Sequence, residues 1–296
     1  MAGTLSVSAK RFFGKRRVCA LTGKPRSSFY YEPVVTPVSE QGRRGPKVKV
    51  SDDLVLEHVR RVLKESPFLG EGHRKIHSML RLEGITVGRD RLLRILREHE
   101  LLAPYRQVRE LGPRNHDGTI QTEKPNEMWG TDLTFTTTEE DGAVAVFACV
   151  EHFNTECLGI HAAISANRFE AMEPMRQAVK DRYGNYERGV ASGVKLRHDH
   201  GTQYISRYFQ SEIKFLGLES SPSFVRSPEG NGVSERFMRT LKEQLLWVRR
   251  FKNVEELRLA LHDFKEKYNN KWKLERYGHL SPKRVYENFL AAQAVA

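Results

Sequence analysis

Three acidic residues stand in contexts that suit metal-assisted chemistry: Asp132, Asp199 and Glu235. Asp132 lies in an alternating, β-branched run typical of a strand, and Asp199 ends a second strand-like run. Glu235 follows a glycine-rich stretch that leads into a helical pattern, with 35 residues between it and Asp199. Two strand carboxylates and one helix carboxylate can hold a pair of Mg²⁺ ions, which stabilise both oxygens of a phosphoryl transfer. The three acids therefore predict a phosphoryl-transfer site.

The spacing of these acids is not informative alone, because the chain contains 37 Asp and Glu residues. On spacing alone, three ordinary surface carboxylates are the simpler interpretation. The sequence contexts of the acids are more informative than their spacing, because the elements follow in the order strand, long αβ stretch, strand, glycine-rich loop, helix. A carboxylate at an apolar strand end also needs a partner, because burying an unpaired charge is costly.

The basic charge of the chain is concentrated in its first part. Residues 1–126 contain 25 Lys and Arg against 14 Asp and Glu, a net charge of +11. Residues 127–296 contain 24 against 23, a net charge of +1. A concentrated basic segment is typical of proteins that bind the phosphate backbone of nucleic acids. We therefore expect residues 1–126 to bind nucleic acid, the alternative being a merely charged surface.

Residues 51–103 contain three short helical patterns. Ser51 followed by two aspartates marks the start of the first, and glycines separate it from patterns at 74–82 and 88–97. The third pattern buries its leucines and leaves four arginines for the outer face: Arg89, Arg91, Arg94 and Arg97. This layout is typical of a helix-turn-helix, whose last helix enters the major groove of DNA. The alternative is a helical bundle with a solvated basic face.

Proline, glycine and charge patterns divide the chain into six segments. The first is expected to hold a helix at 8–21 and a short second helix at 25–31. The predicted segments are a small helical, helix-turn-helix-like unit (1–32), a basic linker (33–50), a helix-turn-helix DNA-binding domain (51–103), a linker (104–125), a catalytic core (126–250) and a C-terminal helical extension (251–296).

The core shows strand-like and helix-like patterns in an α/β order. Strands are predicted at 128–138, 143–153, 157–164, 194–199 and 218–223, and helices at 168–183 and 206–216. Three hairpin-linked strands followed by helix, strand, helix and strand indicate a mixed sheet. With the placement of the acids, this order predicts an RNase H-like α/β fold: a mixed five-stranded sheet flanked by helices and preceded by all-α helix-turn-helix modules.

Three blocks of sequence resemble transposases with a retroviral-integrase-type core. They are Asn126-Glu-Met-Trp-Gly-Thr-Asp-Leu-Thr134, His198-Asp-His-Gly-Thr-Gln-Tyr204 and Gly232-Val-Ser-Glu-Arg-Phe-Met-Arg-Thr-Leu-Lys-Glu243. The chain is most similar to the OrfB-type product of the IS-three family of bacterial insertion sequences, and the resemblance covers most of its length. The family also carries a helix-turn-helix region that ends in an arginine-rich helix.

The resemblance implies roles for specific residues. Asp132, Asp199 and Glu235 would form the metal-binding catalytic triad of a DDE enzyme. Arg239 and Lys242, on the helix face of Glu235, would contact terminal DNA phosphates; ordinary exposed helix charge is the alternative. The segment 227–232 resembles the mobile catalytic loop of the family. His198 and His200 depart from the family's pattern, and we expect them to satisfy hydrogen bonds at the strand end.

The resemblance also implies a reaction and partners. It implies Mg²⁺-dependent DNA strand cleavage and strand transfer with two ions, for which Mn²⁺ can substitute. The partners would be the double-stranded inverted-repeat ends and target DNA, further copies of the chain in a dimer or higher assembly, and an upstream-frame OrfA-type protein. Two alternatives are a DNA-binding regulator with an inactive core and a nuclease acting on RNA or hybrids.

Other features narrow the class of protein. No run of about 18 apolar residues that could span a bilayer is present, and residues 1–11 lack the apolar stretch of a signal peptide. The three cysteines, Cys19, Cys149 and Cys157, show no CxxC pairing, which argues against a cysteine-based zinc site. They fit a reducing bacterial cytoplasm, where the protein is expected to be associated with the nucleoid. Cys149 is expected to fill the core.

Overall fold

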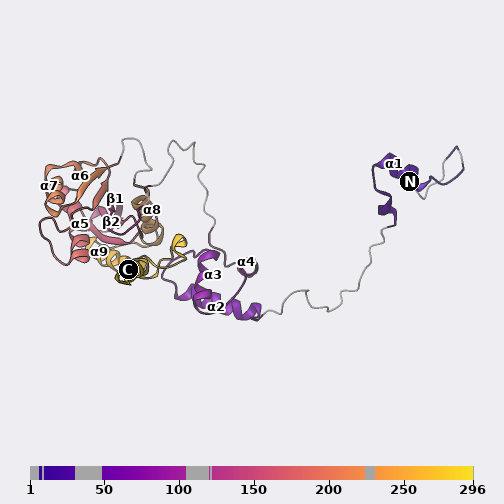
Figure 1. The fold of residues 1–296 in the computed structure, drawn as a ribbon, viewed down its shortest axis with the longest axis horizontal. Coiled ribbons are helices and arrows are strands. Elements are labelled where there is room, and N and C mark those ends of the chain that lie inside the picture. The colour runs from indigo at the N-terminus through magenta and orange to yellow at the C-terminus, as the bar shows by residue number, and fades with distance from the viewer. Residues whose placement is uncertain are drawn as a thin grey trace. The chain divides into compact units, whose positions relative to one another are not determined.

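A computed structural model of the chain describes residues 7–8, 10–30, 49–104, 120, 122–223 and 231–295. Contacts divide the chain into two units, Met1–Lys49 and Val50–Ala296 (Figure 1). The predicted linkers at 33–50 and 104–125 lie largely outside the described residues. The predicted boundaries at residues 126 and 250, both within the second unit, stay predictions.

In its described residues the first unit contains the α-helix α1 (Lys15–Thr22) and the 3-10 helix η1 (Arg26–Phe29). The helix α1 begins later than the predicted start at residue 8. It ends at Gly23, whose left-handed backbone (φ 65°) is one that glycine adopts readily. The second predicted helix, at 25–31, is present only as the 3-10 turn η1.

Three helices follow at the start of the second unit: α2 (Asp52–Glu65), α3 (His73–Leu82) and α4 (Arg89–Glu98). The side chain of Ser51 accepts a hydrogen bond from the backbone N–H of Leu54 (3.3 Å) and caps α2 as predicted. The apolar stripes of the three helices enclose one small core. Its fully buried members are Val55, Val59, Ile76, Leu80, Leu92, Ile95 and Leu96.

The five strands form one mixed sheet in the order β3-β2-β1-β4-β5, which confirms the predicted RNase H-like fold. The strands are β1 (Met128–Thr138), β2 (Gly142–Glu151), β3 (Cys157–Ala163), β4 (Lys195–His198) and β5 (Glu219–Pro222). The first three pair antiparallel, whereas β4 is parallel to both β1 and β5. The first strand is therefore central and lies between β2 and β4.

Helices cover both faces of the sheet because β2 is apolar on both sides (Figure 1). Val144 and Val146 face a core shared with α8 (Gly232–Leu241) and α9 (Val254–Lys271). Phe147 and Cys149 face the opposite core, shared with α5 (Arg168–Tyr183) and α7 (Arg207–Leu216). Successive side chains of a strand point to opposite faces, so one unbroken apolar strand supplies both cores. The predicted role of Cys149 as a core residue is confirmed, since its side chain is fully buried, as is that of Trp129 in the same core.

Several predicted boundaries shift. The helix predicted at 206–216 is α7, which begins at Arg207 because the Ser206 side chain accepts from the Phe209 N–H (3.2 Å) and caps it. The short helix α6 (Thr202–Ile205), directly before Ser206, was not predicted. A π-helical turn, η3 (Lys242–Leu246), continues α8. After α9 the chain forms η4 (Glu275–Tyr277) and α10 (Pro282–Val295), both within the segment predicted as a C-terminal helical extension. No described helix is both long and apolar enough to cross a bilayer.

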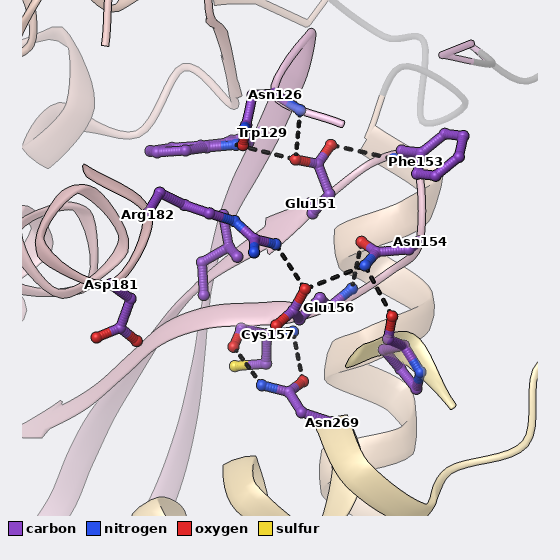
Figure 2. Close-up of polar contacts among 12 residues, drawn as sticks. Asn126, Trp129, Glu151, Phe153, Asn154, Glu156, Cys157, Asp181, Arg182 and Asn269 are labelled. Carbon is purple, nitrogen blue, oxygen red and sulfur yellow. Dashed lines mark hydrogen bonds and ion pairs between the residues drawn. The ribbon is translucent and has the colours of Figure 1, made fainter. Parts of the chain in front are cut away.

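A buried polar network supports the turn between β2 and β3 (Figure 2). Glu151 accepts hydrogen bonds from the backbone N–H groups of Asn126 (2.8 Å) and Phe153 (3.1 Å) and from the Trp129 indole (3.1 Å). Burial raises the pKa of Glu151 to about 7. Beside it, Arg182 of α5 forms a buried ion pair with Glu156 (2.5 Å). The network joins the hairpin to α5.

Replacing Arg182 by methionine is expected to destabilise the fold by about 3–5 kcal/mol, because it leaves the Glu156 carboxylate buried without its cation. Only 7% of the Arg182 side chain and 11% of the Glu156 side chain are exposed. The free energy of unfolding from urea titrations would measure the loss. The double variant Arg182→Met/Glu156→Gln should recover much of it, and an equal loss in both variants would contradict this explanation.

The turn between α2 and α3 contacts the sheet domain within the same unit. The Phe68 ring packs edge-on against Trp272 (4.9 Å between centroids) and belongs to the core that α8 and α9 share. Gln244 of η3 accepts from the Leu69 N–H (2.7 Å) and donates to the Leu69 carbonyl (3.1 Å). The helix-turn-helix region is thus anchored to the helix that follows Glu235.

Candidate active site

Asp132 lies in the middle of β1, on the face that α8 covers. Its neighbours Trp129 and Leu133 belong to the opposite core, so alternation directs Gly130 and Asp132 toward α8. One carboxylate oxygen accepts from the Leu133 N–H (2.8 Å). Burial raises the pKa of Asp132 to about 6, and the negative charges of Asp199 and Glu235 contribute to the rise. The second and third acids therefore act electrostatically on the first.

Asp199 directly follows β4, the strand parallel to β1. The register pairs Gly130 with Arg197, and its continuation by two residues leads to Asp132 and Asp199. The Asp199 side chain accepts from the Gly201 N–H (2.8 Å), which orients it at the start of α6. The pairing of these two adjacent parallel strands thus places Asp132 beside Asp199, just beyond the end of β4.

Glu235 lies in the first turn of α8, a helix that packs on β1 and β2. Val233, Ser234 and Phe237 on the inner face are buried, whereas the Glu235 side chain is exposed beside them. Partial desolvation raises the pKa of Glu235. Residues 227–230 of the predicted catalytic loop (227–232) lie outside the described residues.

The donor set suits a divalent cation of the Mg²⁺ or Mn²⁺ type, which prefers carboxylate oxygens. Mutual repulsion disfavours the ionised form of Asp132, and a cation between the acids would relieve it. In the part of the chain that is described, no group of three or more His, Cys, Asp or Glu side chains is placed so that it could hold a metal ion. Asp199 and Glu235 act on the charge of Asp132, but the side chains of the three acids do not converge on one point.

Lys242 is the basic residue most closely connected with these acids. Its charge lowers the pKa of Asp132, which places the ammonium group within electrostatic range of the site. Arg239 is exposed and pairs with Glu243 one turn further along (3.0 Å). The sequence grouped the two residues, and the structure distinguishes them: the charge of Lys242 acts on Asp132, whereas Arg239 forms an exposed ion pair with Glu243.

The two histidines beside Asp199 form hydrogen bonds at the strand ends, as expected. His198 contacts the Asp199 carbonyl (2.7 Å) and the Ser220 hydroxyl (2.9 Å) through its two ring nitrogens. His200 contacts the Ser223 carbonyl (2.7 Å). Both rings therefore fasten β4 to β5 and the residue beyond it.

The four arginines of α4 differ in their surroundings. Arg89 and Arg97 are exposed, which leaves them available for an external ligand. Arg91 binds the Asp52 carboxylate (Nε, 2.7 Å) and the Val50 carbonyl (2.7 Å). Arg94 binds the same carboxylate and Glu98, so two of the four arginines are paired within the domain.

A cluster of polar residues beneath Asp132 was not predicted. A Cβ on Gly130 would overlap the Ser234 hydroxyl and lie 2.8 Å from His152 Nε2 and 2.9 Å from Asn231 Oδ1. All three side chains are buried. The glycine inside an apolar strand was the available signal, since such a glycine often marks a close approach.

Stability is expected to fall with acidity because His152 is buried and neutral. Burial and the charges of Arg197 and Arg276 lower the pKa of His152 to about 4. The unfolded chain, with a pKa near 6.5, takes up this proton first, so stability is lost as pH falls from about 6.5 to about 4. Relative to His152→Gln, the wild type should lose up to about 3 kcal/mol between pH 7 and pH 4. A difference in unfolding free energy that does not change with pH would refute this.

Two parts of the chain match models of known domain families. Residues 51–109 match the model of an HTH-like domain, and residues 216–281 match the model of an integrase core domain. The second match contains Glu235 and Lys242. The helical region with the arginine-rich helix and the half of the sheet domain that carries α8 are therefore each similar to a known domain.

Relatives that match over about two thirds of their length include insertion-element transposases. The chain is 27% identical over 215 residues to the transposase InsD for insertion element IS2A/D/F/H/I/K of Escherichia coli, covering 70% of this chain and 69% of the relative. The transposase InsD for IS2-9 of strain K12 is likewise 27% identical, with 70% and 67% covered.

Solved structures with a similar trace include two viral proteins. One is a chain of the simian T-cell lymphotropic virus intasome in complex with the PP2A regulatory subunit B56 gamma, with 18% identity, a TM-score of 0.47, and 71% of this chain and 70% of that chain covered. The other is the catalytic core domain of BIV integrase, with 17% identity, a TM-score of 0.42, and 57% and 99% covered.

Proposed function

We propose that this chain is an insertion-sequence transposase, similar to those that carry an HTH-like domain and an integrase core, and that it cleaves and joins DNA strands at the ends of an insertion sequence. The homologues indicate a polynucleotidyl transferase, and the proposal adds the residues and the reaction. The observation that carries it is the placement of Asp132 on β1, of Asp199 after the adjacent parallel strand β4 and of Glu235 on α8, from which the two latter acids raise the pKa of Asp132.

In this proposal the acids hold divalent cations. Asp132 and Asp199 would bind one ion, and Asp132 and Glu235 a second. When bound, the ions activate the attacking water or 3′-hydroxyl and stabilise the leaving oxygen. The chain itself positions the acids, with β1 and β4 fixing two of them and α8 carrying the third. Lys242 offers a positive charge for a DNA phosphate beside the site.

We assign DNA recognition to residues 51–103 and catalysis to residues 126–250. The HTH-like domain supports DNA binding, and Arg89 and Arg97 are its exposed candidates for phosphate or base contacts. Arg91 and Arg94 would have to leave Asp52 to take part. Pairing of two DNA ends would involve a homo-oligomer and, in this family, an upstream-frame OrfA-type protein.

A cleavage assay on labelled duplexes that carry the element's terminal repeats would test this function. Wild type and Glu235→Gln would be compared in Mg²⁺ and in EDTA, with DNA binding measured in parallel. We expect strand cleavage only in Mg²⁺ and only with the wild type, whereas both proteins bind DNA. Binding without cleavage, with the upstream-frame protein added as well as without it, would instead indicate a DNA-binding regulator with an inactive core.

A further inference from the structure

The buried polar atoms around Gly130 lie between strand β1, which carries Asp132, and helix α8, which carries Glu235. Gly130 is on β1, two residues before Asp132 and on the same face. Ser234 is the residue before Glu235 on α8, and Asn231 directly precedes that helix. His152 follows β2, and its backbone N–H donates to the Met128 carbonyl of β1 (3.0 Å). We call Gly130, His152, Asn231 and Ser234 the Gly130 cluster.

The cluster has a direct connection to the backbone beside Asp132. The Asn231 amide donates to the Thr131 carbonyl (3.0 Å), the peptide group that links Thr131 to Asp132. The absent side chain of Gly130 lets α8 approach β1 closely, because a Cβ there would overlap Ser234 Oγ. The separation of α8 from β1 is therefore set by polar atoms in contact with a glycine.

Most polar atoms of the cluster have no hydrogen-bond partner, although they are buried. Exposed fractions are 1% for Ser234, 3% for His152 and 6% for Asn231. Ser234 Oγ, Asn231 Oδ1 and both ring nitrogens of His152 are without a hydrogen-bond partner. Buried polar atoms normally find partners, and apolar residues of similar size would hold α8 on the sheet more stably. Exceptions of this kind occur at functional sites.

We propose that Asn231, Ser234 and His152 are positioning residues that set the distance between Glu235 and Asp132 when the acids take up their cation. The inference rests on the proposed function. Because these donors and acceptors have no partners, α8 can shift slightly on β1 and form new hydrogen bonds once the cation is bound. Apolar side chains in the same contact could form no such bonds. The imidazole of His152 stays neutral at physiological pH and offers one N–H and one acceptor nitrogen.

This role predicts that stability and activity respond in opposite directions. Ser234→Ala removes a buried hydroxyl without a partner, so the metal-free protein should unfold at the same or a higher temperature. The same variant should cleave about 10–100-fold more slowly and need more Mg²⁺ for half-maximal rate, as is usual when a residue that orients metal ligands is lost. Asn231→Asp, which keeps the shape but cannot donate to Thr131, should show a similar loss of cleavage.

Thr138→Val provides a matched control at the other end of β1. Thr138 is buried, and its hydroxyl accepts from the Asp141 N–H (3.2 Å), so its removal costs a hydrogen bond far from the acids. We expect this variant to lose stability while its cleavage rate and Mg²⁺ dependence stay those of the wild type. The control thereby shows the opposite pattern from Ser234→Ala.

The test measures three quantities on the full chain: cleavage rate against Mg²⁺ concentration, DNA affinity, and the rise in melting temperature that Mg²⁺ or Mn²⁺ produces. If the Gly130 cluster positions Glu235 relative to Asp132, Ser234→Ala and Asn231→Asp should weaken the metal-induced rise in melting temperature and leave DNA affinity unchanged. Unaltered cleavage and metal response in Ser234→Ala would overturn it. A wild type that neither cleaves nor responds to metal would refute the proposed function instead. If the wild type responds to metal without cleaving, the metal-induced rise alone decides the role of the cluster.

Discussion

Replacing Asp132 by asparagine is expected to lower metal-dependent strand cleavage by about 10³-fold or more. Metal-ion stabilisation of a phosphoryl transition state contributes several kcal/mol, and each 1.36 kcal/mol corresponds to a factor of ten in rate. Asp132 is the acid that both neighbouring acids influence, so its loss would affect both proposed ions. Initial cleavage rates on DNA ends at saturating Mg²⁺ would measure the effect.

The same substitution is expected to stabilise the metal-free protein. Burial and two neighbouring acids raise the pKa of Asp132 to about 6, so the folded state disfavours its ionised form and stability falls as pH rises from about 3.8 to about 6. Above that range asparagine removes a cost on the order of 2 kcal/mol. Asp263→Asn, on the exposed side of α9, should change neither property. An Asp132→Asn protein that is both active and unchanged in stability would exclude the proposed site.

Gly159→Ala is expected to destabilise the fold by about 4 kcal/mol or more, which is among the larger effects of single substitutions. Gly159 lies in β3 beneath α5. A Cβ there would overlap the carbonyl oxygen of Pro174 and lie 2.7 Å from its carbonyl carbon. The obstacle is helix backbone rather than a flexible side chain, so α5 must move away from the sheet and disturb a close-packed core.

Urea unfolding monitored by circular dichroism would measure this loss. Gly72→Ala is the matched control, since nothing lies within 4 Å of the position of a Cβ on Gly72 and its φ is negative (−74°). Its cost as an N-cap change should be about 1 kcal/mol or less. Equal stability losses for the two variants would show that the contact of β3 with α5 is not the constraint.

The order of the core elements could be predicted because their patterns are local. The alternation of Met128–Thr138 and the length of Arg168–Tyr183 gave the bounds of β1 and α5. Features that depend on distant partners could not be predicted. Asp52 lies far in sequence from Arg91 and Arg94, and its double ion pair follows from the packing of α2 on α4.

The candidate site divides in the same way. The three acids were predicted from their contexts and from the resemblance, whereas the Gly130 cluster was not. Its members come from β1, the end of β2 and α8, and the sequence signals only a close approach at Gly130, not which residues make it. Asn231 and Ser234 were visible only as neighbours of Glu235.

The ion pairs of Asp52 with Arg91 and Arg94 have a consequence for how salt affects DNA binding. Each protein cation that neutralises a phosphate releases condensed counterions, and the slope of log affinity against log salt counts those cations. Arg91 and Arg94 of α4 are already paired with the Asp52 carboxylate. If they bound DNA, a phosphate would replace this carboxylate, so they would release fewer counterions than two unpaired arginines. The slope should therefore be shallower than four arginines would give, and Asp52→Asn should steepen it.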